Sequence, residues 1–420
     1  MPANPSVSQR ILANGLPVVE MPIAGRGATT IVLALPAGAR HEREEEVGVA
    51  HVLEHMAFKG SERYRTATEL NRAAAYLGTE LDGLATNEYV EFSCVVRSQS
   101  AMAAADLLSE VAGRPLLTEE HFHAERSVIL QEIADDAEDP ASRAEDRLIA
   151  ALFGSHRLGK SVTGHAVDVE RLTRQQALAF HERQWSPERG VLVLAGNLED
   201  IDRPQLEDYF MRLAERPAPA PPQPLGAFQR QVEVEERDGE VVHLRLAYAV
   251  PAFDLTLGER RAAAEVYSDL LGGPAGSRLF DELREQRSLC YWIDGFLWGY
   301  DHASFLSVDC SIKAADLPEV CERIDAIVGD LAANGPTEEE VARARSYATG
   351  SAALTFESVG ACADHAVELI IEYGDHDVTP ARYLAALERV TRADICELAS
   401  RVAPGPCVGC VGPVGATAFG

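Results

Sequence analysis

The hydrophobic and polar positions of this chain follow two periods, and these periods predict where strands and helices lie. Nearly continuous apolar runs at 29–35 and 191–195 are typical of buried central strands. Apolar residues spaced three and four apart predict helices instead. In the first half we expect strands over 11–19 (broken at Asn14-Gly15), 29–35, 86–96 and 191–195, and helices over 49–60, 66–77, 101–112, 118–140 and 173–184.

The second half of the chain repeats this order at an offset of roughly 215 residues, as a duplicated domain would. Its expected strands are 241–250, 291–297 and 303–312, and its expected helices are 259–271, 277–286, 317–333, 338–354 and 380–401. The pattern predicts an α+β fold of two homologous domains, each a mixed or antiparallel sheet covered by helices.

A proline-rich stretch separates the two halves. Five prolines occur within residues 217–224, which cannot sustain a helix or a central strand. The predicted organisation is therefore an N-terminal domain at 1–216, a linker at 217–225 and a homologous C-terminal domain at 226–420.

Composition limits the classes of partner. The chain has 420 residues, 46% of them hydrophobic, and a net charge of −28, which argues against nucleic acid and anionic membranes as partners. No apolar run reaches membrane-spanning length, and the N-terminus lacks a signal-peptide core, so we expect a cytoplasmic protein. The eight cysteines are scattered and expected to be reduced; Cys407 and Cys410 fit a terminal strand of small residues.

The segment His51-Val52-Leu53-Glu54-His55 carries the clearest chemistry in the first half. On a helix, His51 and His55 are an i, i+4 pair on one face, so two imidazole nitrogens can reach one metal ion. Glu54 lies beside them, close enough to take a proton from a metal-activated water. Such a short pattern also arises by chance, so a third ligand is needed to decide whether it is functional.

A second helix offers carboxylates for that role. In the helix expected to begin at Thr118, Glu125 and Glu132 are seven residues apart and share one face. Catalytic zinc sites commonly have three protein ligands and leave a fourth position for water. Glu132 and Glu125 are therefore the candidates to complete the site, while the equivalent helix of the second half, around Ala263–Leu271, contains no histidine. One metal site per chain is expected.

HVLEHMAFKG and ERSVILQEI, in which 76 residues separate His55 from Glu132, together resemble the pitrilysin and insulinase family of zinc metallopeptidases, in particular its short-chain processing-peptidase branch. The resemblance implies that His51, His55 and Glu132 bind Zn²⁺, that Glu54 is the general base, and that Glu125 assists from behind the ligands. It also implies that each chain forms half of a clamshell.

The likeness continues after the linker, where GGPAGSRLFDELREQRSLCY resembles the family's second-domain signature. It implies that Arg284 and Tyr291 reach an active site across a closed chamber and stabilise the oxyanion that forms there. Because such a chamber needs four domains, two chains would pair, as a homodimer or as a heterodimer with a paralogous chain.

Residues 81–85, Leu81-Asp82-Gly83-Leu84-Ala85, resemble the edge strand that pairs with the peptide substrate in this family. The chain departs from the usual pattern, in which asparagine and alanine occupy the positions of Asp82 and Gly83. A carboxylate here would repel acidic substrate side chains, and glycine would loosen the strand.

These observations predict a zinc-dependent endopeptidase that hydrolyses unfolded peptides, by general peptide turnover or by removal of a leader peptide. The alternative is a non-catalytic assembly or peptide-binding subunit that partners an active paralogue. Relatives of that kind usually lack a ligand or the base, whereas this sequence has both.

Overall fold

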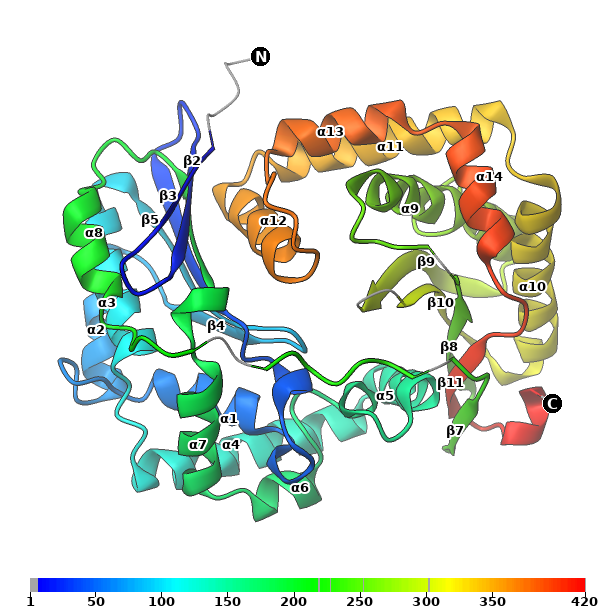
Figure 1. The fold of residues 1–420 in the computed structure, drawn as a ribbon. Helices are drawn as coiled ribbons and strands as arrows, with labels where there is room; N and C mark the ends of the chain where they lie inside the picture. The colour runs from blue at the N-terminus through cyan, green and yellow to red at the C-terminus, as the bar shows by residue number, and fades with distance from the viewer. Residues whose placement is uncertain (1–6, 218–219, 227, 252, 301–302, 420) are drawn as a thin grey trace. The chain divides into compact units, whose positions relative to one another are not determined.

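The computed structural model describes residues 7–217, 220–226, 228–251, 253–300 and 303–419, and within them the chain forms two compact units (Figure 1). Unit 1 comprises Met1–Ala134, Ser161–Gln223 and Thr355–Pro380, and unit 2 comprises Asp135–Lys160, Pro224–Leu354 and Ala381–Gly420. The chain is therefore not divided at one point, because each half contributes a segment to the unit formed mainly by the other half.

The sheet of unit 1 has the order β1-β2-β6-β3-β5-β4. Strands β2 and β6 are parallel, and the other neighbouring pairs are antiparallel. Strand β4 lies at an edge of the sheet. The strands are β1 (Ser8–Ile11), β2 (Pro17–Pro22), β3 (Ala28–Leu35), β4 (Asp82–Ala85), β5 (Val90–Arg97) and β6 (Val191–Gly196).

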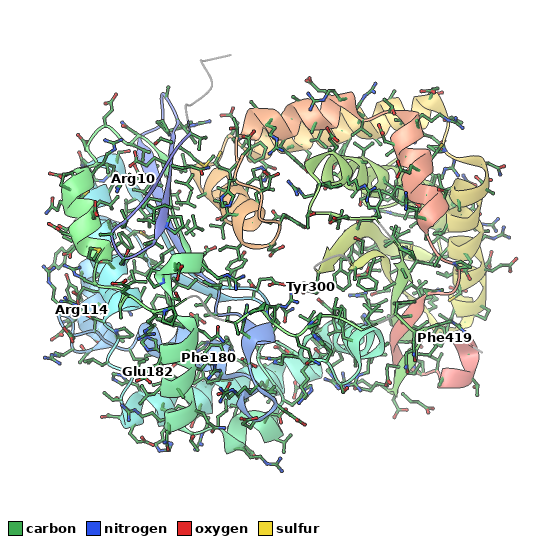
Figure 2. All side chains as sticks on the ribbon, viewed as in Figure 1. Arg10, Arg114, Phe180, Glu182, Tyr300 and Phe419 are labelled. Carbon is green, nitrogen blue, oxygen red and sulfur yellow. The ribbon has the colours of Figure 1, made fainter. Side chains whose placement is uncertain are left out.

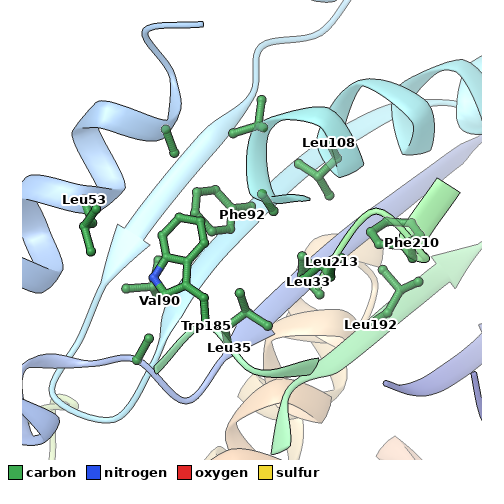
Figure 3. Packing of buried hydrophobic residues seen from close by; sticks show 14 of the residues in the cluster. Leu33, Leu35, Leu53, Val90, Phe92, Leu108, Trp185, Leu192, Phe210 and Leu213 are labelled. Atoms are coloured by element: carbon green, nitrogen blue, oxygen red, sulfur yellow. The ribbon is translucent and has the colours of Figure 1, made fainter. Parts of the chain in front are cut away.

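Both faces of this sheet are covered, which explains the apolar run of β3. Leu33 and Leu35 face the larger core, where they pack with Phe92 and Trp185 (Figure 3). Ala34, between those two leucines, and Val32, before them, point to the other face and pack with residues of α12 (Val359–Ile371). Unit 1 contains α1 (Val49–Ala57), α2 (Ala67–Leu77), α3 (Ala101–Gly113), α6 (Ala166–Arg171), α7 (Arg174–Gln184), α8 (Arg203–Phe210) and α12 (Val359–Ile371), and α4 (Glu119–Glu138) begins there.

In the part of the chain that the structure describes, unit 2 repeats the topology of unit 1 without a counterpart of β1. Its order is β7-β11-β8-β10-β9, with β7 and β11 parallel and the other neighbours antiparallel. This agreement confirms the predicted fold of two similar α+β domains. The strands are β7 (Val232–Glu236), β8 (Val241–Ala249), β9 (Cys290–Tyr300), β10 (Ala303–Lys313) and β11 (Cys407–Gly412); Tyr300 and Phe419 are labelled in Figure 2.

A helix from the first half of the sequence, α5 (Pro140–Phe153), packs on the unit 2 sheet against β11 and β8. Gly409 of β11 permits this close approach, because a methyl group there would overlap the backbone nitrogen of Leu148. The exchange is reciprocal, since α12 of the second half covers the unit 1 sheet. The other helices of unit 2 are α9 (Gly258–Leu271), a π-helix (Phe280–Gln286), α10 (Leu317–Asn334), α11 (Glu338–Thr355, which ends in unit 1), α13 (Pro380–Arg389, of which Pro380 belongs to unit 1) and α14 (Arg392–Arg401).

Several predicted boundaries were wrong. The strand expected from residue 86 begins at Val90, because Thr86–Tyr89 forms the turn between β4 and β5. Pro140, expected to mark the end of the preceding helix, is also the first residue of α5. Proline is tolerated at that position because the first N–H of a helix has no partner within the helix. The helix expected over 380–401 is two helices, the second capped by Thr391.

Two other predictions concern the linker and membranes. Residues 218 and 219 of the linker lie outside the described residues, and its remaining residues form neither helix nor strand. In the described part of the chain, no helix is both long enough and apolar enough to cross a membrane.

Candidate metal centre

Helix α1 carries the histidine segment, and it is held in place by buried apolar residues and by a carboxylate at its N-terminus. Val52, Leu53 and Met56 are fully buried, so they fix the rotation of the helix. The carboxylate of Glu42 accepts hydrogen bonds from the backbone N–H groups of Gly48 and Ala50, both at 2.9 Å. This contact satisfies two donors at the N-terminus, where a negative charge is also favourable. Glu42 was not predicted, although its position before the helix was a usable signal.

The structure brings together the three residues predicted as ligands. Glu132 Oε2 lies 3.9 Å from His51 Nε2 and 3.7 Å from His55 Nε2. Each residue offers one ligand atom, and these three atoms lie within 4.8 Å of one another. In the described part of the chain, they form the one cluster of His, Cys, Asp or Glu side chains that could hold a metal ion. The three residues come from two helices, α1 and α4, that are far apart in sequence.

These donors fit zinc. Two ligand atoms each about 2.1 Å from a tetrahedral ion are about 3.4 Å apart, a few tenths of an ångström less than the distances from Glu132 to the histidines. Two imidazole nitrogens and one carboxylate are also a donor set typical of catalytic zinc. His51 is neutral near pH 7, because burial and then the nearby His55 lower its pKa to about 4. The neutral imidazole is the form that binds a metal.

Glu125 orients one of the histidines. Its Oε2 lies 3.3 Å from His55 Nδ1 and 3.0 Å from Lys59 Nζ, and the residue is only 4% exposed. The carboxylate favours the tautomer in which Nδ1 carries the proton, which leaves Nε2 of His55 available as a donor. Lys59, which was not predicted, offsets the negative charge of Glu125.

Glu54 is buried beside the same nitrogens. Its Oε2 lies 4.0 Å from His51 Nε2 and 3.9 Å from His55 Nε2. Burial raises the pKa of Glu54 to about 7, with further contributions from the charges of Asp82 and Glu132. A carboxylate with this proton affinity, next to the candidate metal ligands, is suited to accept and return a proton.

Of the predicted substrate segment, Asp82–Ala85 forms β4 and Leu81 lies directly before this strand. A methyl group on Gly83 would overlap Glu54 Oε1 and stand 2.5 Å from Cε2 of the Phe58 ring. The missing side chain thus makes the space that the Glu54 carboxyl occupies. The sequence suggested that glycine loosens the strand; the structure shows in addition that it accommodates Glu54.

Arg284 and Tyr291 lie together in unit 2. The guanidinium carbon of Arg284, on the π-helix, is 5.0 Å from the centre of the Tyr291 ring on β9. The register of β9 with β10 shifts by one residue between Cys310 and Ile312, and such a bulge re-aims the side chains beside it. Tyr291 is 84% exposed, so its hydroxyl is accessible.

The chain is similar to known proteins along most of its length. Residues 24–166 match the family described as "Insulinase (Peptidase family M16)", and residues 171–347 match "Peptidase M16 inactive domain". An uncharacterised zinc protease of Mycobacterium leprae is 31% identical over 84% of this chain and 79% of its own length. Another, from Mycobacterium tuberculosis, is 30% identical over 94% of this chain and 91% of its own length.

Solved structures share the fold. The crystal structure of a peptidase M16 inactive domain from Pseudomonas fluorescens superposes with a TM-score of 0.87 at 19% identity and covers 98% of both chains. A protease from Helicobacter pylori gives a TM-score of 0.84 at 19% identity, covering 98% of this chain and 100% of its own. At these identities the likeness concerns the fold.

We expect Glu132→Gln to lose zinc, because a neutral amide is a much weaker ligand than a carboxylate. The affinity should fall by more than about 100-fold, whereas Glu120→Gln, on the exposed first turn of the same helix, should leave it unchanged. Zinc per chain after loading and dialysis, measured by elemental analysis, checks this. Equal retention by both variants would exclude Glu132 as a ligand.

Gly83→Ala should destabilise unit 1, since the added methyl group must displace Glu54, Phe58 or the strand itself. Overpacking of this kind costs about 1–3 kcal/mol. Urea unfolding measures the difference in free energy. Gly27→Ala is the matched control, because a methyl group there meets nothing within 4 Å. A loss of stability no larger than that of the control would show that the site relaxes freely.

Proposed function

Because this chain belongs to the insulinase family of peptidases, we propose that it is a zinc-dependent endopeptidase acting on unfolded peptides. The convergence of His51, His55 and Glu132 beside the buried carboxyl of Glu54 supports the proposal most directly. Zinc, when bound, supplies a Lewis acid that polarises the scissile carbonyl and activates water. Its predicted ligands are the two histidines and Glu132.

The protein residues handle the protons and the substrate backbone. Glu54 takes a proton from the attacking water and returns it to the leaving amine, a role for which its raised pKa is suited. Glu125 keeps His55 in one orientation through Nδ1. The edge strand β4 offers backbone groups to an extended peptide, which permits varied substrate sequences.

The second half of the chain supplies a cation and a phenol. Arg284 and Tyr291 stabilise the oxyanion in the zinc site of a facing chain, so that a dimer encloses the peptide. Both residues and the full zinc set are present in one sequence, which supports a homodimer over a pair of specialised chains. Removal of a leader peptide from an unfolded precursor is one use of such a chamber.

Glu54→Gln should abolish peptide hydrolysis while zinc is retained, since the amide keeps the shape of the side chain but cannot accept the proton. A loss of about 10²–10⁴-fold in kcat/KM is expected. Cleavage of a mixed peptide library by mass spectrometry and zinc content measure the two effects. Glu44→Gln, an exposed residue before α1, is the control. If the zinc-loaded wild type and Glu54→Gln were equally inactive, a peptide-binding subunit would be the better description.

The shared chamber makes a complementation test possible. Glu54→Gln and Arg284→Ala homodimers should each be inactive, and mixing them under subunit exchange should restore about a quarter of the wild-type activity, because about half of the dimers are then mixed and each mixed dimer has one complete site of two. Restoration requires that the arginine of one chain serve the base of the other. Arg287→Ala, at the end of the same helix, should remain active alone. If the mixture stays inactive although mass spectrometry detects mixed dimers, the exchange of residues between chains is wrong.

A further inference from the structure

The free edge of β4 can be identified from its hairpin with β5. Thr86 N donates to Tyr89 O at 2.9 Å, and the register continues through Ala85↔Val90 and Leu84↔Glu91 to Gly83↔Phe92. Hydrogen-bonded and non-hydrogen-bonded pairs alternate in an antiparallel ladder. Leu84 therefore bonds to β5, whereas the N–H of Gly83 points away from it, toward the edge where a peptide would pair.

This outward N–H already has a partner. Gly83 N donates to Asp82 Oδ1 at 3.0 Å, so the carboxylate occupies the place of a substrate carbonyl oxygen. Short acidic side chains compete with sheet hydrogen bonding in this way. A peptide that adds to β4 must displace the carboxylate, which then needs another partner.

The surroundings of Asp82 do not supply that partner. Its side chain is exposed, and among the described residues no Lys or Arg forms a salt bridge with it. An acid lies nearby: after burial and the charge of Asp364, the charge of Asp82 contributes to raising the pKa of the buried Glu91 to about 7. The displaced carboxylate would therefore have an acid, Glu91, among its neighbours and no ion-pair partner among the described residues.

We propose that Asp82 determines specificity, selecting peptides with a Lys or Arg beside the residue whose carbonyl binds Gly83 N–H. The cation compensates the carboxylate that the peptide backbone displaces, whereas an acidic side chain adds repulsion. Neutral peptides bind at the cost of the displaced hydrogen bond. The inference rests on the proposed function, because it assumes that substrate pairs with β4.

The chain contains a matched control for this arrangement. On β9 of unit 2, Gly295 N donates to Asp294 Oδ1 at 2.9 Å, which repeats the Asp-Gly contact of β4. Two variants separate charge from capping at Asp82. Asp82→Asn removes the charge but keeps an oxygen able to accept from Gly83 N–H, and Asp82→Ala removes both. Asp294→Asn makes the same chemical change away from the proposed substrate strand.

The test uses alanine-rich ten-residue peptides that carry one Lys, Gln or Glu at each position in turn. Their binding to zinc-loaded Glu54→Gln protein is followed by fluorescence anisotropy, and their cleavage by the zinc-loaded wild type by mass spectrometry. At one position we expect Lys to be preferred over Glu on the order of tenfold, with Gln between them.

Asp82→Asn should remove this preference, and Asp82→Ala should in addition bind the neutral peptides more tightly than Asp82→Asn does. Asp294→Asn should keep the wild-type preference. A preference that persists in Asp82→Asn overturns the inference even if the peptides are cleaved. The two proposals can also fail separately. If the wild type cleaves none of the peptides but the binding preference exists and is lost in Asp82→Asn, the inference is supported and the proposed hydrolysis is rejected.

Discussion

Burial of the Glu54 carboxyl among like-charged and polar groups is the constraint on which the rest of the site depends. Its Oε2 lies about 4 Å from Nε2 of both imidazoles, and its Oε1 lies against the edge strand, where a side chain on Gly83 would overlap it. An acid in such a place is stable only if its neighbours are fixed and its charge is compensated or neutralised. The apolar side of α1 provides the fixed position, and the proposed metal would provide the compensating charge.

The two helices that carry the site are held by different means. Helix α1 is short and depends on its buried apolar residues and on the Glu42 cap, because nine residues do not form a stable helix in isolation. Helix α4 has twenty residues and buries Phe122, Glu125 and Ile129. Glu125 connects the two helices through His55 and Lys59, so the position of Glu132 is tied to that of the histidines.

The exchange of α5 and α12 gives each sheet a second covered face. Val32 and its neighbours on β3 would otherwise expose an apolar surface, and α12 covers it. The same device operates in unit 2, where α5 lies close on Gly409. In both units the strand at the edge, β4 or β9, follows the same Asp-Gly pattern. The two units therefore share this backbone arrangement at the edge of the sheet. They differ in the candidate metal ligands, since α9, the counterpart of α1, carries no histidine.

The sequence by itself determined the features that depend on short periods. The spacing of His51 and His55 placed them on one face of a helix, and the repeated order of strands and helices predicted two similar α+β domains. The resemblance added Glu132 as the distant ligand, and the structure brings it to the histidines. Tertiary structure alone decided the exchange of α5 and α12, the Glu42 cap, the space that Gly83 leaves for Glu54 and the contact of Asp82 with Gly83 N–H. These depend on where separate segments meet or on which backbone groups face the open edge of a sheet, and hydrophobic periodicity carries no information about either.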